Sequence, residues 1–324
     1  MNQLDIDLNL LQAFERGLDP QHPERSAIPA RVLGYGEIST VFEIQAEGMR
    51  HLACKRLPIF ETTAEVERYT AAYREYNRLL AEEIGISIPA HGYASFLSAT
   101  GRPVFYIIQH QLPSESIGHR AMHLLPQAQV LLLVQRILAE LRRVWTFNRH
   151  QDRVQVAIDG QISNWAIADF DPHHPQVDAG TRLLYMDTST PLFRIQGVEQ
   201  LDPELFLRSA PSFLAWVLRR FFLADVVNRY YDLHRVSVDL IANFYKEQRP
   251  DLIPALVRVV NEFLATEAQD LGAAPVSEEE VRSYYREDAF IWSFYLTARR
   301  IDRFLRTRLL RRDYPYILPG PIRR

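Results

Sequence analysis

The sequence predicts an α+β fold in two parts, a small antiparallel sheet with one helix followed by a larger, mainly helical region. Two observations predict this division. Short apolar runs bounded by turns are typical of strands and dominate residues 31–113, whereas apolar residues recur at helical spacing through most of residues 114–324. The chain has 324 residues, 47% of them hydrophobic, and can bury a substantial core. We therefore expect one bilobal unit with its boundary at residues 111–116.

Residues 1–30 are expected to form a helical extension before the sheet. Leucines and Phe14 recur at helical spacing from residue 4 onward, with acidic and amide side chains between them. Gly17 follows the last apolar position, and glycine is common where a helix ends. The chain should then enter the sheet through a proline-containing loop.

The sheet is expected to start with a glycine-turn hairpin, because a strand-like run at residues 41–44 follows the glycine-rich turn and residues 49–57 would return antiparallel to it. One amphipathic helix follows, with alanine, tyrosine and leucine on one face and charged residues on the other. The expected strands cover residues 41–44, 49–57, 90–96 and 104–109, and the helix covers residues 62–84.

The region after residue 113 is expected to be helical apart from a β-like island at residues 154–187. In this island two strand-like runs, 165–170 and 182–186, flank a turn rich in aspartate, proline and histidine. The most informative polar residues of the region lie on the island. The expected helices cover residues 127–147, 203–208, 212–223, 224–244, 254–265, 277–289 and 291–310.

Composition limits the classes of partner and location. The net charge of −3 gives no general reason to expect a polyanionic partner. A single cysteine, Cys54, rules out an internal disulfide framework. The acidic and apolar start lacks the basic region and cleavage site of a signal peptide, and no apolar run reaches bilayer-spanning length. We therefore expect a cytoplasmic protein without a transmembrane helix.

The glycine turn is a candidate phosphate-binding loop. Gly34 and Gly36 could let backbone amides approach phosphate oxygens, where a side chain would be in the way. Ser39 stands where a third glycine would be usual in such a loop. An ordinary hairpin with glycine at its turn explains the same residues, so the interpretation depends on the polar residues farther along the chain.

Lys55 and Glu75 are candidates for an ion pair beside that loop. Lys55 lies on the next strand-like segment, where its ammonium could contact the α and β phosphates of a nucleotide. Glu75 lies in the following helix, one turn before the apolar Leu79, and could hold the lysine in place. An exposed lysine and a solvated helix glutamate are the alternative, and other glutamates of this helix could take the place of Glu75.

The apolar run at residues 105–113 ends in a loop, as would a hinge whose backbone meets the edge of an adenine ring. Ile108, Gln109 and Gln111 are the candidate nucleotide contacts in this segment. An ordinary core strand would have the same composition.

Three polar residues of the β-like island are candidates for phosphoryl-transfer chemistry. Asp159 could orient or deprotonate an acceptor hydroxyl, and Asn164, five residues later, could ligate magnesium. Asp187 ends a buried apolar run, and a magnesium ion would give its carboxylate a partner. An aspartate-glycine turn capped by asparagine explains the first two residues equally well.

Two further patterns on the island are rejected as sites. Asp169 begins an Asp-Phe-Asp triplet that resembles a metal-binding motif, but it follows Asn164 by only five residues. His173 and His174 lack the cysteine or carboxylate partners of a zinc site, and we expect them in a surface turn.

The C-terminal helix is basic and amphipathic, which makes it a possible docking element for an acidic protein surface, a membrane or a nucleic acid. A helix packed on its own lobe with its arginines in water is the favoured interpretation. The arginines are Arg299, Arg300, Arg303, Arg306, Arg308, Arg311 and Arg312.

Taken in chain order, these motifs resemble the protein-kinase-like superfamily. The similarity is greater to the aminoglycoside phosphotransferase and choline kinase branch, and to bacterial kinase-like proteins of unknown role, than to eukaryotic protein kinases. It covers residues 32–187 by motif. The resemblance implies a small N-terminal lobe, a helical C-terminal lobe, ATP in the cleft between them and Mg²⁺ as cofactor.

The resemblance also implies roles for individual residues. Gly34 and Gly36 match the phosphate loop, Lys55 the phosphate-binding lysine and Glu75 its helix partner. The catalytic aspartate and the two metal ligands correspond to Asp159, Asn164 and Asp187. The sequence departs from the family pattern at Ala157, where a histidine is usual, and at Thr188-Ser189, which replace Phe-Gly.

The expected function is ATP- and magnesium-dependent phosphoryl transfer to a hydroxyl of a small molecule. The alternative is a non-catalytic kinase-like module that binds a nucleotide or a partner. A protein or nucleic-acid partner for the C-terminal arginine helix is a third, less favoured interpretation.

Overall fold

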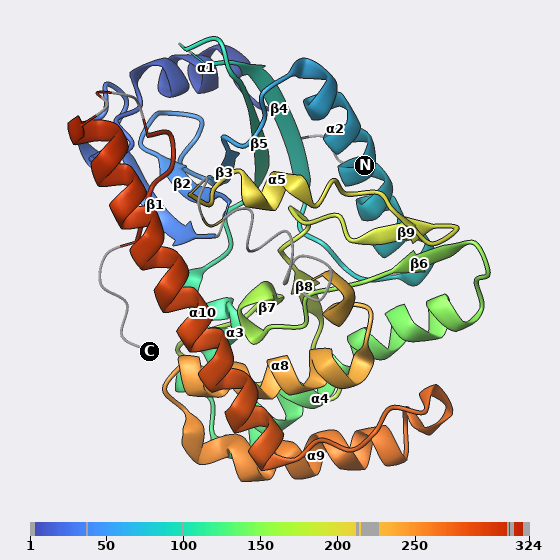
Figure 1. Ribbon diagram of the computed structural model, residues 1–324. Helices are drawn as coiled ribbons and strands as arrows, with labels where there is room; N and C mark the ends of the chain where they lie inside the picture. The colour runs from blue at the N-terminus through green and yellow to red at the C-terminus, as the bar shows by residue number, and fades with distance from the viewer. Residues whose placement is uncertain are drawn as a thin grey trace.

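A computed structural model gives the fold of the chain and describes residues 4–36, 38–98, 100–211, 214, 227–309, 311 and 314–319. An antiparallel sheet forms the N-terminal part, and the C-terminal part is mainly helical (Figure 1). This arrangement agrees with the α+β class predicted from the sequence.

The N-terminal sheet has five antiparallel strands in the order β1-β2-β3-β5-β4. Strand β5 lies inside the sheet, and its apolar run lets it be buried on both faces. Phe105 and Ile107 face one side of the sheet, and Tyr106 and Ile108 face the other. The strands are β1 (Ala30–Tyr35), β2 (Thr40–Ile44), β3 (Leu52–Leu57), β4 (His91–Leu97) and β5 (Pro103–His110).

Helix α1 (Leu8–Gly17) covers one face of this sheet. Asp7 caps its start by accepting a hydrogen bond from the Leu10 N–H, and Leu11 and Phe14 are fully buried against the sheet. A short 3₁₀ turn (Pro23–Arg25) leads into β1. The expected N-terminal extension is therefore packed into the core of the sheet.

A buried ion pair joins α1 to the sheet. The Glu15 carboxylate accepts two hydrogen bonds from the Arg56 guanidinium, both at 2.7 Å, and a third from the Tyr106 hydroxyl at 2.6 Å. Arg56 also donates to the carbonyl of Pro315 at 2.8 Å. The charged groups are thus fully paired although they lie out of water.

Helix α2 (Thr63–Arg78) covers the other face. Thr62 and Glu65 form a reciprocal capping box at its start, and Tyr69 and Tyr73 pack against Phe105. The helix continues into a π-helical turn (Leu79–Ile84) that ends at Gly85, whose φ of 81° favours glycine.

The C-terminal part contains six described α-helices and a group of short strands. Helix α3 was not predicted, whereas the expected helices near residues 127–147, 203–208 and 254–265 are confirmed. The helices are α3 (Gly118–Leu124), α4 (Gln127–Arg149), α5 (Glu204–Leu207), α8 (Leu233–Lys246), α9 (Ile253–Ala265) and α10 (Glu278–Phe304). The strands are β6 (Val154–Val156), β7 (Trp165–Ile167), β8 (Leu183–Tyr185), β9 (Phe193–Ile195) and β10 (Val198–Glu199).

Three helix expectations need correction, and a fourth lies outside the described residues. The helices expected at 277–289 and 291–310 form one continuous helix, α10, which passes into a π-helical turn (Leu305–Leu309), because no glycine or proline interrupts residues 278–309. The helix expected at 224–244 is described only from residue 227, and α8 begins after Asp232, which caps it. The helix expected at 212–223 lies outside the described residues, apart from Leu214.

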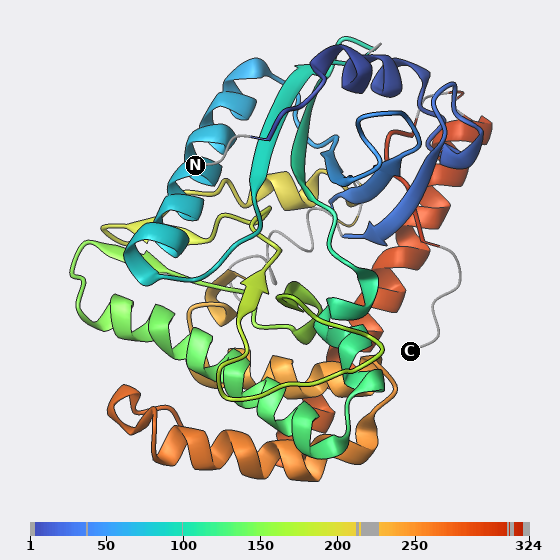
Figure 2. The same cartoon turned by 180° about the vertical axis from the view of Figure 1, so that it is seen from behind.

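Helix α10 runs along one side of the molecule, from α8 and α9 to the sheet edge that holds β1 and β2 (Figure 1, Figure 2). After it, residues 314–319 return toward the sheet, where Ile317 joins the core beneath α1. None of the described helices is long and apolar enough to cross a bilayer.

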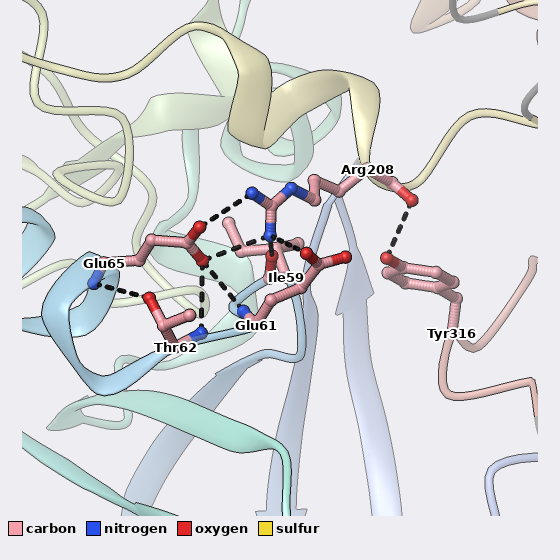
Figure 3. Close-up of polar contacts among 6 residues, drawn as sticks. All are labelled: Ile59, Glu61, Thr62, Glu65, Arg208 and Tyr316. Carbon is pink, nitrogen blue, oxygen red and sulfur yellow. Dashed lines mark hydrogen bonds and ion pairs between the residues drawn. The ribbon is translucent and has the colours of Figure 1, made fainter.

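Arg208, just after α5, connects α2 with the C-terminal segment (Figure 3). Its guanidinium donates to both carboxylate oxygens of Glu65, at 3.1 and 2.8 Å, and lies 3.6 Å from Glu61. Its own carbonyl accepts a hydrogen bond from the Tyr316 hydroxyl at 2.9 Å. One arginine therefore ties the start of α2 to two segments that are distant in sequence.

The Arg208–Glu65 pair makes stability depend on pH. The hydrogen bond from Arg208 outweighs burial and lowers the pKa of Glu65 to about 2, so its stabilisation is present above pH ~4.5 and is lost as the pH falls toward 2. Glu65→Gln should cost about 1–2 kcal/mol at pH 7, with screening taken into account, and much less at pH 2.5. Urea unfolding at both pH values measures this difference, and an equal loss at both would contradict it.

Candidate active site

Lys55 and Asp187 meet directly although 132 residues separate them. Lys55 projects from β3, and its Nζ donates to Asp187 Oδ1 at 2.7 Å and to Ser189 Oγ at 2.6 Å. Ser189 in turn donates to the same carboxylate oxygen from its hydroxyl at 2.6 Å and from its N–H at 3.3 Å. Burial raises the pKa of Asp187, but Lys55 and the hydrogen bonds outweigh it, so the pKa stays below its usual value. The site therefore holds an ionised carboxylate.

Asp159 has the opposite electrostatic environment. Burial raises its pKa to about 7, and the negative charge of Asp239 on α8 adds to the effect. The Gln161 N–H donates to Asp159 Oδ1 at 3.1 Å, while the Gln161 side chain donates to Asp239 Oδ2 at 3.3 Å. Gln161 thus bridges two carboxylates that repel each other.

Asn164 connects the two aspartate segments. The Nδ2 of its side chain donates to the backbone carbonyl of Asp159 at 3.3 Å. Its backbone carbonyl accepts a hydrogen bond from the Met186 N–H at 2.8 Å. Strands β7 and β8 pair immediately beyond these residues, with Trp165 opposite Tyr185. The hairpin therefore brings Asp159, Asn164 and Asp187 to one place, next to Lys55.

Glu75 does not join this cluster, which corrects the expected ion pair with Lys55. Its carboxylate pairs with Arg78 at 2.9 Å on the outer side of α2. The inward face of α2 carries Tyr76, and each residue turns the helix by about 100°, which takes Glu75 away from the sheet. Leu79 is buried one turn later, but four residues correspond to a rotation of about 40° around the helix, so the burial of Leu79 does not bring Glu75 to the same face.

Three buried tyrosines of α2 occupy the face on which the glutamate was expected. The Tyr69 hydroxyl donates to the carbonyl of Ser189 at 2.7 Å, and the Tyr76 hydroxyl donates to the carbonyl of Ala157 at 2.8 Å. Tyr73 lies between them on the same face. Helix α2 therefore contacts the backbone beside both Asp187 and Asp159. The sequence does contain a signal for this face, because Tyr69, Tyr73 and Tyr76 follow one another at intervals of four and three residues, the spacing of one helix face.

The glycine turn lies close to Lys55, because Val41, two residues after Ser39, pairs with Lys55 across β2 and β3. A β-bulge shifts the register of β1 just before Gly34. The Gly36 N–H donates to the carbonyl of Ser39 at 3.0 Å, and a Cβ at Gly36 would lie 2.6 Å from Ser39 Oγ. A Cβ at Gly36 would therefore require the Ser39 hydroxyl to move, whereas a Cβ at Gly34 would meet nothing within 4 Å.

The three expected nucleotide contacts of β5 have different surroundings. Ile108 is fully buried on the α1 side of the sheet. Gln109 faces the site, and its Nε2 donates to the carbonyl of Met186 at 3.1 Å. The Gln111 N–H already donates to the carbonyl of His51 at 2.8 Å, and its side chain donates to Glu43 at 3.0 Å. The structure thus places only Gln109 next to Asp187.

The rejected patterns lie at the surface. Asp169 is 90% exposed at its side chain and pairs with Arg182, and His174 pairs with Asp171 in the turn between β7 and β8. A hollow of about 360 Å³ opens in this loop, lined by residues such as Asp169, Phe170 and Asp178 and not by Lys55, Asp159 or Asp187. Within the described residues, no group of three histidine, cysteine or acidic side chains is arranged to hold a metal ion.

Comparison with known proteins identifies a family. Residues 21–303 match the model of a family of unknown function, DUF6206. The chain belongs to this family. No curated protein matches the DUF6206 chain. Among solved structures, it is similar to WaaP in complex with acyl carrier protein, with 13% identity and a TM-score of 0.33 over 76% of this chain and 90% of the WaaP chain.

Proposed function

We propose that this DUF6206 protein is a bilobal, kinase-like phosphotransferase that uses ATP and Mg²⁺ to phosphorylate a hydroxyl of a small molecule. The observation that carries the proposal is the convergence of Lys55, Asp187, Asn164 and Asp159, which come from three separate segments. Phosphoryl transfer needs a cation for the phosphates, oxygen ligands for a metal and a carboxylate for the acceptor. Each requirement has a residue within this cluster.

The donor atoms suit magnesium, which prefers carboxylate and amide oxygens. The hydrogen bonds described at the Asp187 carboxylate all go to Oδ1, so Oδ2 is the atom for a metal. The Asn164 amide donates its Nδ2 to the Asp159 carbonyl, which assigns its Oδ1 to the same task. A bound Mg²⁺ would neutralise phosphate charge. Lys55, released from Asp187, would contact the nucleotide phosphates, and Gly34, Gly36 and Ser39 would border them.

Asp159 would orient the acceptor hydroxyl and take its proton. With a pKa of about 7, this carboxylate exchanges protons near neutral pH, which suits a general base. Gln161 fixes one of its oxygens, which leaves the other for the acceptor. In place of Glu75, the α2 tyrosines would hold the segments that carry Asp159 and Asp187.

Isothermal titration with ATP in the presence and absence of Mg²⁺ tests the proposal, followed by an assay for loss of the γ-phosphate. Wild-type protein should bind ATP in a magnesium-dependent manner, and Asp187→Ala should lose that dependence. Glu75→Ala is the matched control and should bind as the wild type does, because Glu75 pairs with Arg78 outside the cluster. Absence of magnesium-dependent binding by the wild type would reject the proposal.

A non-catalytic nucleotide-binding module is the second candidate, and one observation favours it. Lys55 is engaged by both Asp187 and Ser189, where the kinase pattern has a glycine in place of Ser189. A lysine held in this way could bind nucleotide without supporting transfer. Magnesium-dependent binding of ATP without loss of the γ-phosphate, for any hydroxylated acceptor tested, would identify this alternative.

A further inference from the structure

Lysine is almost absent from this chain. It occurs only at Lys55 and Lys246, and arginine supplies the other 35 of the 37 basic side chains. The two residue types differ in chemistry, because lysine carries a compact ammonium with three rotatable donors whereas arginine carries a planar fork. Lys55 lies in the proposed phosphate site. The surroundings of Lys246 are therefore informative.

Lys246 is the last residue of α8, and its side chain reaches the turn that carries Asp159. Its Nζ donates to Gln161 Oε1 at 3.5 Å, and the Gln161 N–H donates to Asp159 Oδ1 at 3.1 Å. Asp239, Asn243 and Lys246 follow one another at intervals of four and three residues, so they share one face of α8. The second ammonium of the chain thus lies one glutamine side chain away from Asp159.

Helices α3 and α8 both pack directly on the turn at residues 159–164. A Cβ at Gly118, the first residue of α3, would lie 2.4 Å from the carbonyl of Ile162. A Cβ at Gly160 would lie 2.6 Å from Val236 Cγ1 of α8. Glycine at both positions therefore allows the close approach, and side chains of the two helices border the turn.

The field on this side of the turn is positive. Within the described part of the chain, no carboxylate forms an ion pair with the Lys246 ammonium. Burial lowers the pKa of His119 on α3 to about 4, and the positive charges of Arg120, Lys246 and His123 lower it further. A basic group of α8 and basic groups of α3 therefore act on the same place.

Asp239 is the carboxylate on which Lys246 acts most clearly, but it serves other partners. Its Oδ2 accepts a hydrogen bond from Gln161 Nε2 at 3.3 Å, and its Oδ1 accepts one from Asn243 Nδ2 at 3.2 Å. Burial raises the pKa of Asp239, and among the cations that lower it Arg229 acts more strongly than Lys246. An anion carried by a ligand would supply the counter-charge that Lys246 lacks.

We propose that Lys246 binds an anionic group of the acceptor, so that the small molecule phosphorylated beside Asp159 is a hydroxylated carboxylate or phosphate ester. The acceptor hydroxyl would lie at the free oxygen of Asp159 and the anionic group at the ammonium, with the Gln161 side chain setting the distance between them. The assignment to an acceptor rests on the proposed phosphoryl transfer, whereas the anion site itself does not.

Acetylation of the lysines tests the site directly, because the chain has two of them and mass spectrometry of its peptides resolves both. Without nucleotide, D-glycerate or glycerol 3-phosphate should slow the acetylation of Lys246 several-fold, and more than that of Lys55. The stronger of the two probes identifies the group as a carboxylate or a phosphate. Glycerol and choline are the neutral and cationic controls and should not protect Lys246. Protection by either control would overturn the proposal, as would anions that protect Lys55 alone or neither lysine.

Calorimetric titration with the protecting anion supplies an independent measurement. Lys246→Gln should weaken binding about tenfold or more, the usual effect of losing a charged hydrogen bond, and Lys246→Arg should weaken it less because the charge remains. Arg258→Gln removes the same charge from an exposed position on α9 and is the matched control, which should bind as the wild type does. Equal affinities of the wild type and Lys246→Gln would overturn the proposal.

The outcomes of the two proposals can be told apart. Anion binding that depends on Lys246, in a protein that does not bind ATP with Mg²⁺, would reject the phosphotransferase and keep the anion site. Phosphoryl transfer to a neutral or cationic acceptor in preference to an anionic one would confirm the activity and overturn this inference.

Discussion

Replacing Asp159 by asparagine is expected to lower phosphoryl transfer about 10²–10⁴-fold, the usual effect of removing a general base. Asparagine keeps the size of the side chain and an oxygen for the Gln161 N–H, but it cannot take a proton. Nucleotide binding should be nearly unchanged, because Lys55 and Asp187 remain. Single-turnover transfer of the γ-phosphate at saturating ATP measures the effect, and a rate within twofold of the wild type would remove Asp159 from the reaction.

The pH profile provides the matching control. Because only ionised Asp159 accepts a proton, the rate should rise as pH passes through about 7. Asp239→Asn removes a negative charge that raises the pKa of Asp159, so the rising limb should move to lower pH. A purely structural role for Asp239 would lower the rate at every pH and leave the midpoint in place.

Glu15→Gln is expected to be the most destabilising single polar substitution, with a loss of about 3–5 kcal/mol in the free energy of unfolding. Side-chain exposure is only 7% for Arg56 and 3% for Glu15, so the guanidinium would stay buried without its counter-charge. The Tyr106 hydroxyl would also lose a charged acceptor. Urea unfolding at neutral pH measures the change.

An exposed ion pair on α2 provides the control for this prediction. Glu83 pairs with Arg78 at 2.7 Å, but its side chain is 47% exposed. Glu83→Gln should therefore cost no more than about 0.5 kcal/mol, as is usual for surface pairs. Equal losses for Glu15→Gln and Glu83→Gln would show that burial does not control the strength of these pairs.

The sequence selected the residues that meet at the candidate site best where they follow one another in chain order, and worst where their direction depends on helix phase. Lys55, Asp159, Asn164 and Asp187 could be selected because each ends or begins a recognisable strand or turn. Glu75 could not be assigned correctly, because the burial of Leu79 one turn later does not fix the direction of a residue that lies about 40° away around the helix. Asp239 was missed because it approaches Asp159 only through the packing of α8, which leaves no local pattern.

The same distinction applies to the fold. The glycine turn and the apolar runs of β3 and β5 predict the sheet locally, since strand alternation is a short-range signal. No short-range pattern predicts the burial of Glu15 with Arg56, because the two residues lie 41 positions apart and both are of charged types that usually lie at the surface. Long-range pairing of charges is a property of the packed molecule.

The tyrosine face of α2 has a consequence for how the protein responds to change. Tyr69 and Tyr76 lie on the same helix, and their hydroxyls contact the backbone of the two segments that carry Asp187 and Asp159. A small displacement of α2 should therefore move both segments together. Affinity for metal and readiness to accept a proton should then rise and fall in concert. Natural variation along this helix would tune the whole centre at once.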